Sequence, residues 1–117
     1  MTDAPYEPEE GHLVWIDFDP RTGREQSGRR PAVVVSPRAF WVASRFLIVC
    51  PVTSRVRPFA ASVLLPEGLP VSGEVLTSHI RSIDTLARPV VFAGAALPSP
   101  LLDELREKIA VLIGYRA

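Results

Sequence analysis

Residues 11–37, GHLVWIDFDPRTGREQSGRRPAVVVSP, place a loop rich in glycine and arginine between two short apolar runs. These runs, 12–18 and 31–36, have the length and composition of β-strands. Pro31 can open the second strand because no ladder hydrogen bond is needed from its nitrogen there. The residue before a proline, Arg30, favours an extended backbone, and the glycines of the loop permit turns. We therefore expect a glycine-hinged loop held between two strands.

Further apolar runs, each bounded by turn residues, predict strands at 46–54, 61–65, 74–83 and 89–94. Pro51 inside the first of these runs predicts a bulge or an edge strand. Residues 99–114 instead repeat leucine and isoleucine at helical spacing, and Ser99-Pro100 supplies an N-cap and a first-turn proline. Short strands at this spacing followed by one helix predict a mainly β fold, a small barrel with a C-terminal α-helix.

The chain has 117 residues, 47% of them hydrophobic, which suffices for one domain with a buried core. We expect residues 1–11 to form a flexible acidic lead and residues 12–117 to form the single domain. The N-terminus is acidic and contains proline, unlike a signal peptide, and no apolar run reaches the ~20 residues of a membrane span. The sequence therefore predicts a cytoplasmic protein with no membrane partner.

Cysteine and acidic residues offer little support for metal or thiol chemistry. Cys50, the only cysteine, lies in the apolar run LIVCPV, which favours a small buried side chain over a nucleophile. Asp17 and Asp19 share one face of a strand and could touch a metal ion. No third carboxylate or histidine stands at ligand spacing, so we expect no metal and no cofactor.

Charge is unevenly distributed in a chain whose 13 Lys and Arg balance 13 Asp and Glu. Residues 1–19 carry six acids and no Lys or Arg, whereas residues 20–60 carry eight arginines and one acid, a net charge of 8 − 1 = +7. Such a cationic stretch is the electrostatic footprint of a protein that binds a polyanion. Arginines that merely face solvent would give the same count, and charge alone does not decide between the two interpretations.

The single acid of the cationic stretch, Glu25, stands among four arginines of the first loop, Arg21, Arg24, Arg29 and Arg30. The planar guanidinium fork donates two parallel hydrogen bonds to a phosphate, and nearby positive charge keeps a carboxylate ionised. A structural Glu–Arg ion pair that closes the loop would show the same spacing. From spacing alone, the structural ion pair is the favoured interpretation.

Three segments together resemble the MazF/PemK (Kid-like) toxin ribonucleases of bacterial toxin–antitoxin pairs. They are residues 11–37, CPVTSR at 50–55, and VSGEVLTSHIRSID at 71–84 with the closing helix. The order acid-Gln-x-Gly-x-Arg-Pro at 25–31 is highly characteristic, and the resemblance extends nearly from Gly11 to Gly114. It implies an SH3-like barrel, a homodimer and metal-independent, sequence-specific cleavage of single-stranded RNA. It also implies an acidic, MazE-like antitoxin that covers the cationic groove.

The resemblance also implies roles for individual residues. Glu25 matches the catalytic loop acid of the family, Arg30 its catalytic arginine and Thr53 the hydroxyl that holds the scissile phosphate. Residues in matching stretches that we expect to contact RNA are Arg24, Gln26, Arg29, Ser54, Arg55 and Arg81. Phe18 could stack on a base, although a core position is slightly favoured.

One departure from the family concerns Ser78 and His79, which stand where many relatives carry Asp-Gln. In some relatives the aspartate is assigned a catalytic role that serine cannot take. Both residues remain candidates for the substrate site. Imidazole can transfer protons near neutral pH, but a lone strand histidine is more often structural. His12 has no partner in view and is interpreted as structural.

The resemblance implies a reaction in which a carboxylate removes the ribose 2′-OH proton and arginine stabilises the crowded phosphorane. The products would be a 2′,3′-cyclic phosphate and a 5′-OH. Two non-catalytic alternatives remain open at this point. One is a CcdB-like toxin that binds a protein target, and the other is an RNA-binding module that has lost nuclease activity.

Overall fold

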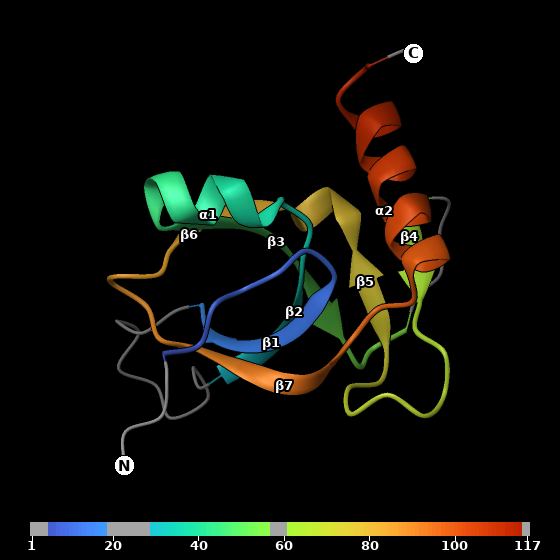
Figure 1. The fold of residues 1–117 in the computed structure, drawn as a ribbon. Helices are drawn as coiled ribbons and strands as arrows, with labels where there is room; N and C mark the ends of the chain where they lie inside the picture. The colour runs from blue at the N-terminus through green and yellow to red at the C-terminus, as the bar shows by residue number, and fades with distance from the viewer. Residues whose placement is uncertain (1–4, 19–28, 57–60, 116–117) are drawn as a thin grey trace.

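The computed structural model describes residues 5–18, 29–56 and 61–115, which form an antiparallel sheet with two helices (Figure 1). The strands are β1 (His12–Asp17), β2 (Arg29–Val34), β3 (Phe46–Thr53), β4 (Ser62–Leu64), β5 (Glu74–Leu76), β6 (Arg81–Asp84) and β7 (Val90–Ala96). The helices are α1 (Arg38–Ser44), α2 (Ser99–Leu112) and the short 3-10 turn η2 (Thr77–His79). Within the described ranges, neither helix has the length and apolar character needed to cross a membrane.

The sheet is strongly curved, and its strands are ordered β4-β5-β3-β2-β1-β7. One edge of β3 pairs with β2, and the other edge is shared between β6, along Phe46–Val49, and β5, along Val52 and Thr53. The outer strands β4 and β7 do not pair with each other in the described part of the chain, so the barrel-like sheet stays open. The predicted mainly β fold with a C-terminal helix is confirmed.

Side chains on opposite faces of the sheet build two separate cores, because successive residues of a strand point to opposite faces. The first core consists of Leu13, Val33, Val35, Cys50, Val52, Val63, Leu65, Val71, Val75, Leu97, Leu102 and Leu105. The second core consists of Val14, Ile16, Phe18, Ala32, Val34, Leu47, Val49 and Ile83. Helix α2 supplies Leu102 and Leu105 to the first core, and Trp41 of α1 packs on the second.

The prediction of one strand over residues 74–83 is wrong, because η2 breaks that segment into β5 and β6. Thr77 is fully buried and its hydroxyl donates to the carbonyl of Ala61, while the Ile80 N–H donates to Thr77 O at 3.2 Å. This turn moves the chain from pairing with the end of β3 to pairing with its beginning. As a result, Ser78 and His79 lie on an exposed turn instead of inside a strand.

Other boundaries differ from the sequence prediction for local reasons. Pro51 lies in a central strand, at the break between the residues of β3 that pair with β6 and those that pair with β5. Helix α2 takes Pro98 as its N-cap, one residue before the predicted Ser99. Helix α1 was not predicted, since none of its seven residues is fully buried and it carries no amphipathic stripe.

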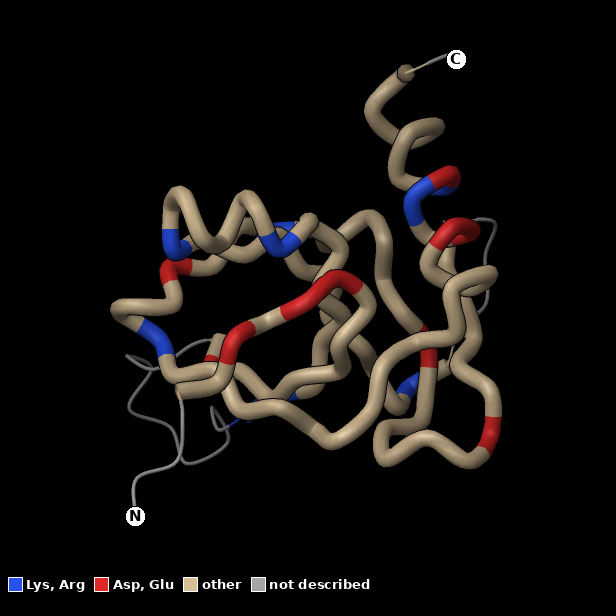
Figure 2. The backbone as a smooth tube through the Cα atoms, viewed as in Figure 1, with Lys and Arg blue, Asp and Glu red and all other residues tan. Residues whose placement is uncertain are grey.

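The N-terminal segment from Pro5 onward lies against the sheet. The Tyr6 hydroxyl is 2.6 Å from His12 Nδ1, and the rings of Tyr6, His12 and Phe92 pack together with centroids 4.5–5.7 Å apart. Ion pairs join the acidic residues of this segment to the two helices, in the combinations Glu7–Arg38, Glu9–Arg38 and Glu10–Arg106. Figure 2 shows where the acidic and basic residues lie along the backbone. His12 is structural, as the sequence indicated.

We expect the His12 contacts to make stability pH-dependent. Burial lowers the pKa of His12 below its ordinary 6.5, with a smaller opposing effect from Glu9, and Nδ1 accepts the Glu9 N–H at 3.3 Å. The folded state therefore binds fewer protons than the unfolded state below about pH 6.5, and stability is lost as the pH falls through the lowered pKa. Thermal unfolding should show a steeper loss of Tm from about pH 7 to about pH 5 in the wild type than in His12→Gln. Equal slopes would contradict this assignment.

We also expect Gly73 to be irreplaceable where β5 meets the end of β3. Gly73 has φ +127°, and a Cβ there would lie 2.1 Å from the carbonyl oxygen of Thr53. Gly68, with φ +95°, has open space around the same position and serves as the matched control. Gly68→Ala should cost about 1–2 kcal/mol of unfolding free energy from left-handed strain alone.

Gly73→Ala should cost clearly more than Gly68→Ala, because the backbone of β3 at Thr53 must move. Chemical denaturation of both variants measures the difference. Equal losses would show that the Thr53 contact does not constrain Gly73.

Candidate functional site

The face of the sheet that carries the second core ends in a pocket. Ile16 and Ala32 belong to the second core, and their cross-strand partners are Arg30 and Pro51. Arg30 and Pro51 therefore lie on the same face of the sheet as that core, toward the ends of the strands. A hollow of about 370 Å³ lies there. The residues that line this site pocket are Phe18, Arg30, Pro51, Val52, Thr53, Leu76, His79 and Arg81. Five of them were singled out from the sequence: Phe18, Arg30, Thr53, His79 and Arg81.

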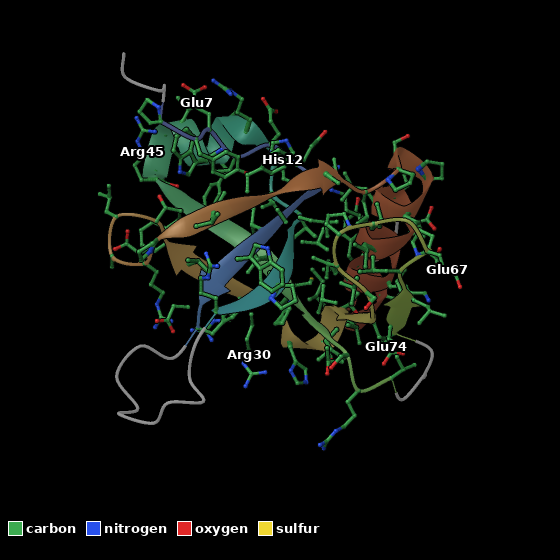
Figure 3. All side chains as sticks on the ribbon, turned by 90° about the horizontal axis from the view of Figure 1, so that it is seen from below. Glu7, His12, Arg30, Arg45, Glu67 and Glu74 are labelled. Atoms are coloured by element: carbon green, nitrogen blue, oxygen red, sulfur yellow. The ribbon has the colours of Figure 1, made fainter. Side chains whose placement is uncertain are left out.

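Arg30 stands at the exposed start of β2, opposite Ile16. Its backbone is extended, as its place before Pro31 predicts. The side chain projects away from the sheet at the rim of the pocket (Figure 3). A guanidinium held on a strand end presents its donors to a ligand without a loop having to order first.

Thr53 is the last residue of β3 and is partly exposed. Its Oγ1 accepts the backbone N–H of Arg55 at 3.1 Å, which orients the hydroxyl at the pocket wall. The pairing of Thr53 with Glu74 and the close approach of Gly73 hold the strand end in place. The hydroxyl therefore sits on rigid backbone, which is a requirement for precise recognition.

Phe18 and Arg81 form the wall of the pocket nearest the second core. Phe18 is 9% exposed and belongs to that core, as the sequence favoured. The guanidinium of Arg81 lies over its ring, 5.1 Å from the centroid, in a cation–π contact. Arg81 is exposed, so this contact holds a second guanidinium at the pocket while it remains accessible.

His79 completes the polar lining from the opposite edge of β3. It ends η2, is exposed, and lines the pocket, whereas its neighbour Ser78 is exposed but does not line it. The η2 break, which sequence periodicity did not reveal, is what brings His79 here. Leu76 just before η2 supplies an apolar wall.

The remaining predicted site residues lie around the pocket or outside the described residues. Arg29, Ser54 and Arg55 are exposed beside it without lining it. Arg24, Glu25 and Gln26 lie outside the described residues, in the segment that connects Phe18 to Arg29.

The described residues contain no cluster suited to bind a metal ion and no exposed cysteine. No three His, Cys, Asp or Glu side chains there are grouped to hold a metal ion. Asp17 stands opposite Arg29 in the register of β1 and β2. Asp19 is outside the described residues. Cys50 is fully buried in the first core, and burial raises the pKa of its thiol to about 12, which keeps it protonated.

The chemistry of the pocket is that of an anion site. Two guanidiniums, one hydroxyl and one imidazole surround a hollow with apolar walls. Arginine and threonine both donate hydrogen bonds to phosphate oxygens, and the guanidinium fork can contact two oxygens at once. The arrangement suits one phosphodiester group with an apolar surface beside it.

Comparisons with known proteins agree over nearly the whole chain. The model of the PemK-like, MazF-like toxins of type II toxin–antitoxin systems matches residues 9–113. The endoribonuclease toxin MazF of Escherichia coli is 37% identical over 109 residues, which cover 93% of this chain and 96% of that protein.

Solved structures give the same result. MazF in a MazE–MazF crystal structure from Deinococcus radiodurans superposes with a TM-score of 0.85 at 42% identity, covering 95% of this chain and all of the other. MazF of the same organism, crystallised alone, superposes with a TM-score of 0.83 at 44% identity, covering 94% of this chain and 99% of the other.

Proposed function

The chain belongs to the PemK-like, MazF-like toxins of type II toxin–antitoxin systems and is an endoribonuclease, and on that premise we propose that it is a sequence-specific mRNA interferase. It would cut single-stranded RNA without a metal ion. The observation that carries this proposal is the site pocket, in which Arg30 and Thr53 meet from two different strands at a hollow able to take one phosphodiester. Both are residues for which the family resemblance implies catalytic roles.

The proposed reaction uses a nucleophile that the RNA already contains. The ribose 2′-oxygen attacks the adjacent phosphorus, the new 2′-O–P bond forms, and the P–O5′ bond breaks. The products carry a 2′,3′-cyclic phosphate and a 5′-OH. Because no water molecule has to be activated, the protein needs a base for the 2′-OH, charge stabilisation for the phosphorane and a proton for the leaving oxygen.

Arg30 and Thr53 would supply the charge stabilisation. The exposed Arg30 guanidinium can donate to the non-bridging oxygens, on which charge accumulates in the phosphorane, and the Thr53 hydroxyl can donate to the same group. Glu25 would be the base that removes the 2′-OH proton. Phe18, just before the segment that carries Glu25, and Arg30, shortly after it, both line the pocket, which supports this assignment.

The other predicted contacts would hold the RNA strand on either side of the cut. Arg29 and Arg55 are exposed at the neighbouring strand ends, with Ser54 next to Arg55. Together with Arg24, Gln26 and Ser78 they would make backbone and base contacts, while Arg81 would share the phosphate with Arg30. Phosphate contacts of this kind fix the register of the strand, and base contacts select the sequence.

An antitoxin and a second copy of the chain complete the proposed assembly. The D. radiodurans structure is a MazE–MazF complex at 42% identity, which supports a MazE-like partner for this chain. We propose that the partner is acidic, that it blocks RNA from the cationic site, and that the active protein is a homodimer in the cytoplasm.

Purified protein incubated with single-stranded RNA and excess EDTA tests the proposal. We expect cleavage to persist in EDTA, with cyclic phosphate at the new 3′ ends, and to fall by about 10²- to 10³-fold in Arg30→Ala, the loss usual for one oxyanion-stabilising donor. Arg45→Ala is the matched control, since Arg45 is also an exposed arginine and lies far from Arg30, beside Glu7 (Figure 3). Its cleavage rate should equal that of the wild type.

Two results would contradict the proposal. Cleavage that stops in EDTA and returns with Mg²⁺ would show a metal-dependent nuclease. RNA that stays intact with folded wild-type protein would instead indicate a non-catalytic toxin or an RNA-binding module.

A further inference from the structure

The reaction just described leaves one requirement without a residue, which is the proton for the departing 5′-oxygen. The pocket lining offers a group for it. We propose that His79 is the general acid that protonates O5′ as the P–O5′ bond breaks. This inference rests on the proposed function and adds a catalytic residue to it.

The chemistry of the other described pocket residues leaves His79 as the donor. Phe18, Pro51, Val52 and Leu76 have no side-chain proton to give. Guanidinium groups do not release a proton in proteins, and aliphatic hydroxyls are very weak acids. Imidazole, in contrast, gives up and regains a proton near neutral pH, which is what a general acid must do in each turnover.

The topology places His79 on the correct side of the phosphate. Arg30 is on β2, which pairs with one edge of β3, and the segment that carries Glu25 connects β1 to β2. His79 is on η2, between the two strands that pair with the opposite edge of β3. In-line displacement requires the attacking and leaving oxygens on opposite sides of the phosphorus. Arg30 and His79 reach the pocket from opposite edges of β3, so a 2′-oxygen that attacks from the β2 side would leave O5′ on the η2 side, where His79 lies.

The η2 turn holds His79 without burying it. Thr77, two residues earlier, is fully buried and hydrogen-bonded to the carbonyl of Ala61, and the Ile80 N–H closes the turn on Thr77 O at 3.2 Å. His79 itself is exposed. The imidazole is therefore carried on anchored backbone and is open to solvent, from which it can be protonated again.

The proton balance closes within one turnover. The 2′-OH proton passes to the Glu25 carboxylate while the His79 imidazolium gives its proton to O5′. After the products leave, the carboxylic acid releases a proton to water and the neutral imidazole takes one up. No oxidant, reductant or metal enters the step.

The decisive experiment uses RNA in which sulfur replaces the bridging 5′-oxygen at the linkage that the wild-type enzyme cuts. A thiolate leaves without being protonated, so an enzyme without its general acid still cleaves this substrate. We expect His79→Gln to cleave ordinary RNA about 10²- to 10³-fold more slowly than the wild type, and the sulfur-containing RNA to within about tenfold of it. Single-turnover rates give the comparison.

Thr53→Ala is the matched control, because its hydroxyl contacts the phosphate and not the leaving group. Its defect should be the same on both substrates. Thermal unfolding of His79→Gln should match the wild type, since the His79 side chain is exposed. Thr53→Ala should unfold at a slightly lower temperature, because it removes the hydroxyl that accepts the Arg55 N–H. His79→Ala repeats the test without the amide group of glutamine.

The remaining outcomes separate the two proposals. Equal losses of His79→Gln on both substrates, or full activity on ordinary RNA, would overturn the general-acid role while leaving the nuclease in place. Failure of the wild type to cleave either RNA would overturn the proposed function itself.

Discussion

The pairing of β3 is the constraint on which the rest of the structure depends. Its two edges are paired differently, with β2 along one side and with β6 and then β5 along the other. The change of partner occurs next to Pro51, whose missing N–H is tolerated at such a break. Beyond it the end of β3 brings Thr53 between Arg30 and His79. The same strand thus contributes to both cores and to the wall of the site pocket.

The arginines of the chain include some that form ion pairs and some that line the site pocket. Ion pairs of Glu7, Glu9 and Glu10 with Arg38 and Arg106 fasten the N-terminal segment to the helices. Arg30 and Arg81 line the pocket instead. This division explains how a chain with no net charge can present cations to RNA.

Local sequence patterns predicted most of the strands. The η2 break and the order of the strands depend on long-range pairing, which those patterns do not contain. Apolar runs bounded by turn residues identified β1, β2 and β3 because those strands bury alternate side chains in the two cores. The same kind of run identified β7, although none of its side chains is fully buried. The same pattern wrongly predicted one continuous strand over residues 74–83. This segment pairs first with the end of β3 and then with its beginning, so it turns at η2, and no local sequence signal predicts that turn. The family resemblance predicted Arg30 and Thr53 as site residues. The position of His79 in the pocket could be seen only from the pairing of β5 and β6 with β3.

A crystal structure of the protein with a short RNA that carries 2′-deoxyribose at the scissile position would show where the scissile phosphate binds. That substrate analogue binds but has no 2′-OH with which to react. The proposed mechanism requires the scissile phosphate to lie in the site pocket, within hydrogen-bond distance of the Arg30 guanidinium and the Thr53 hydroxyl. A phosphate bound elsewhere on the surface, with this pocket empty, would contradict it.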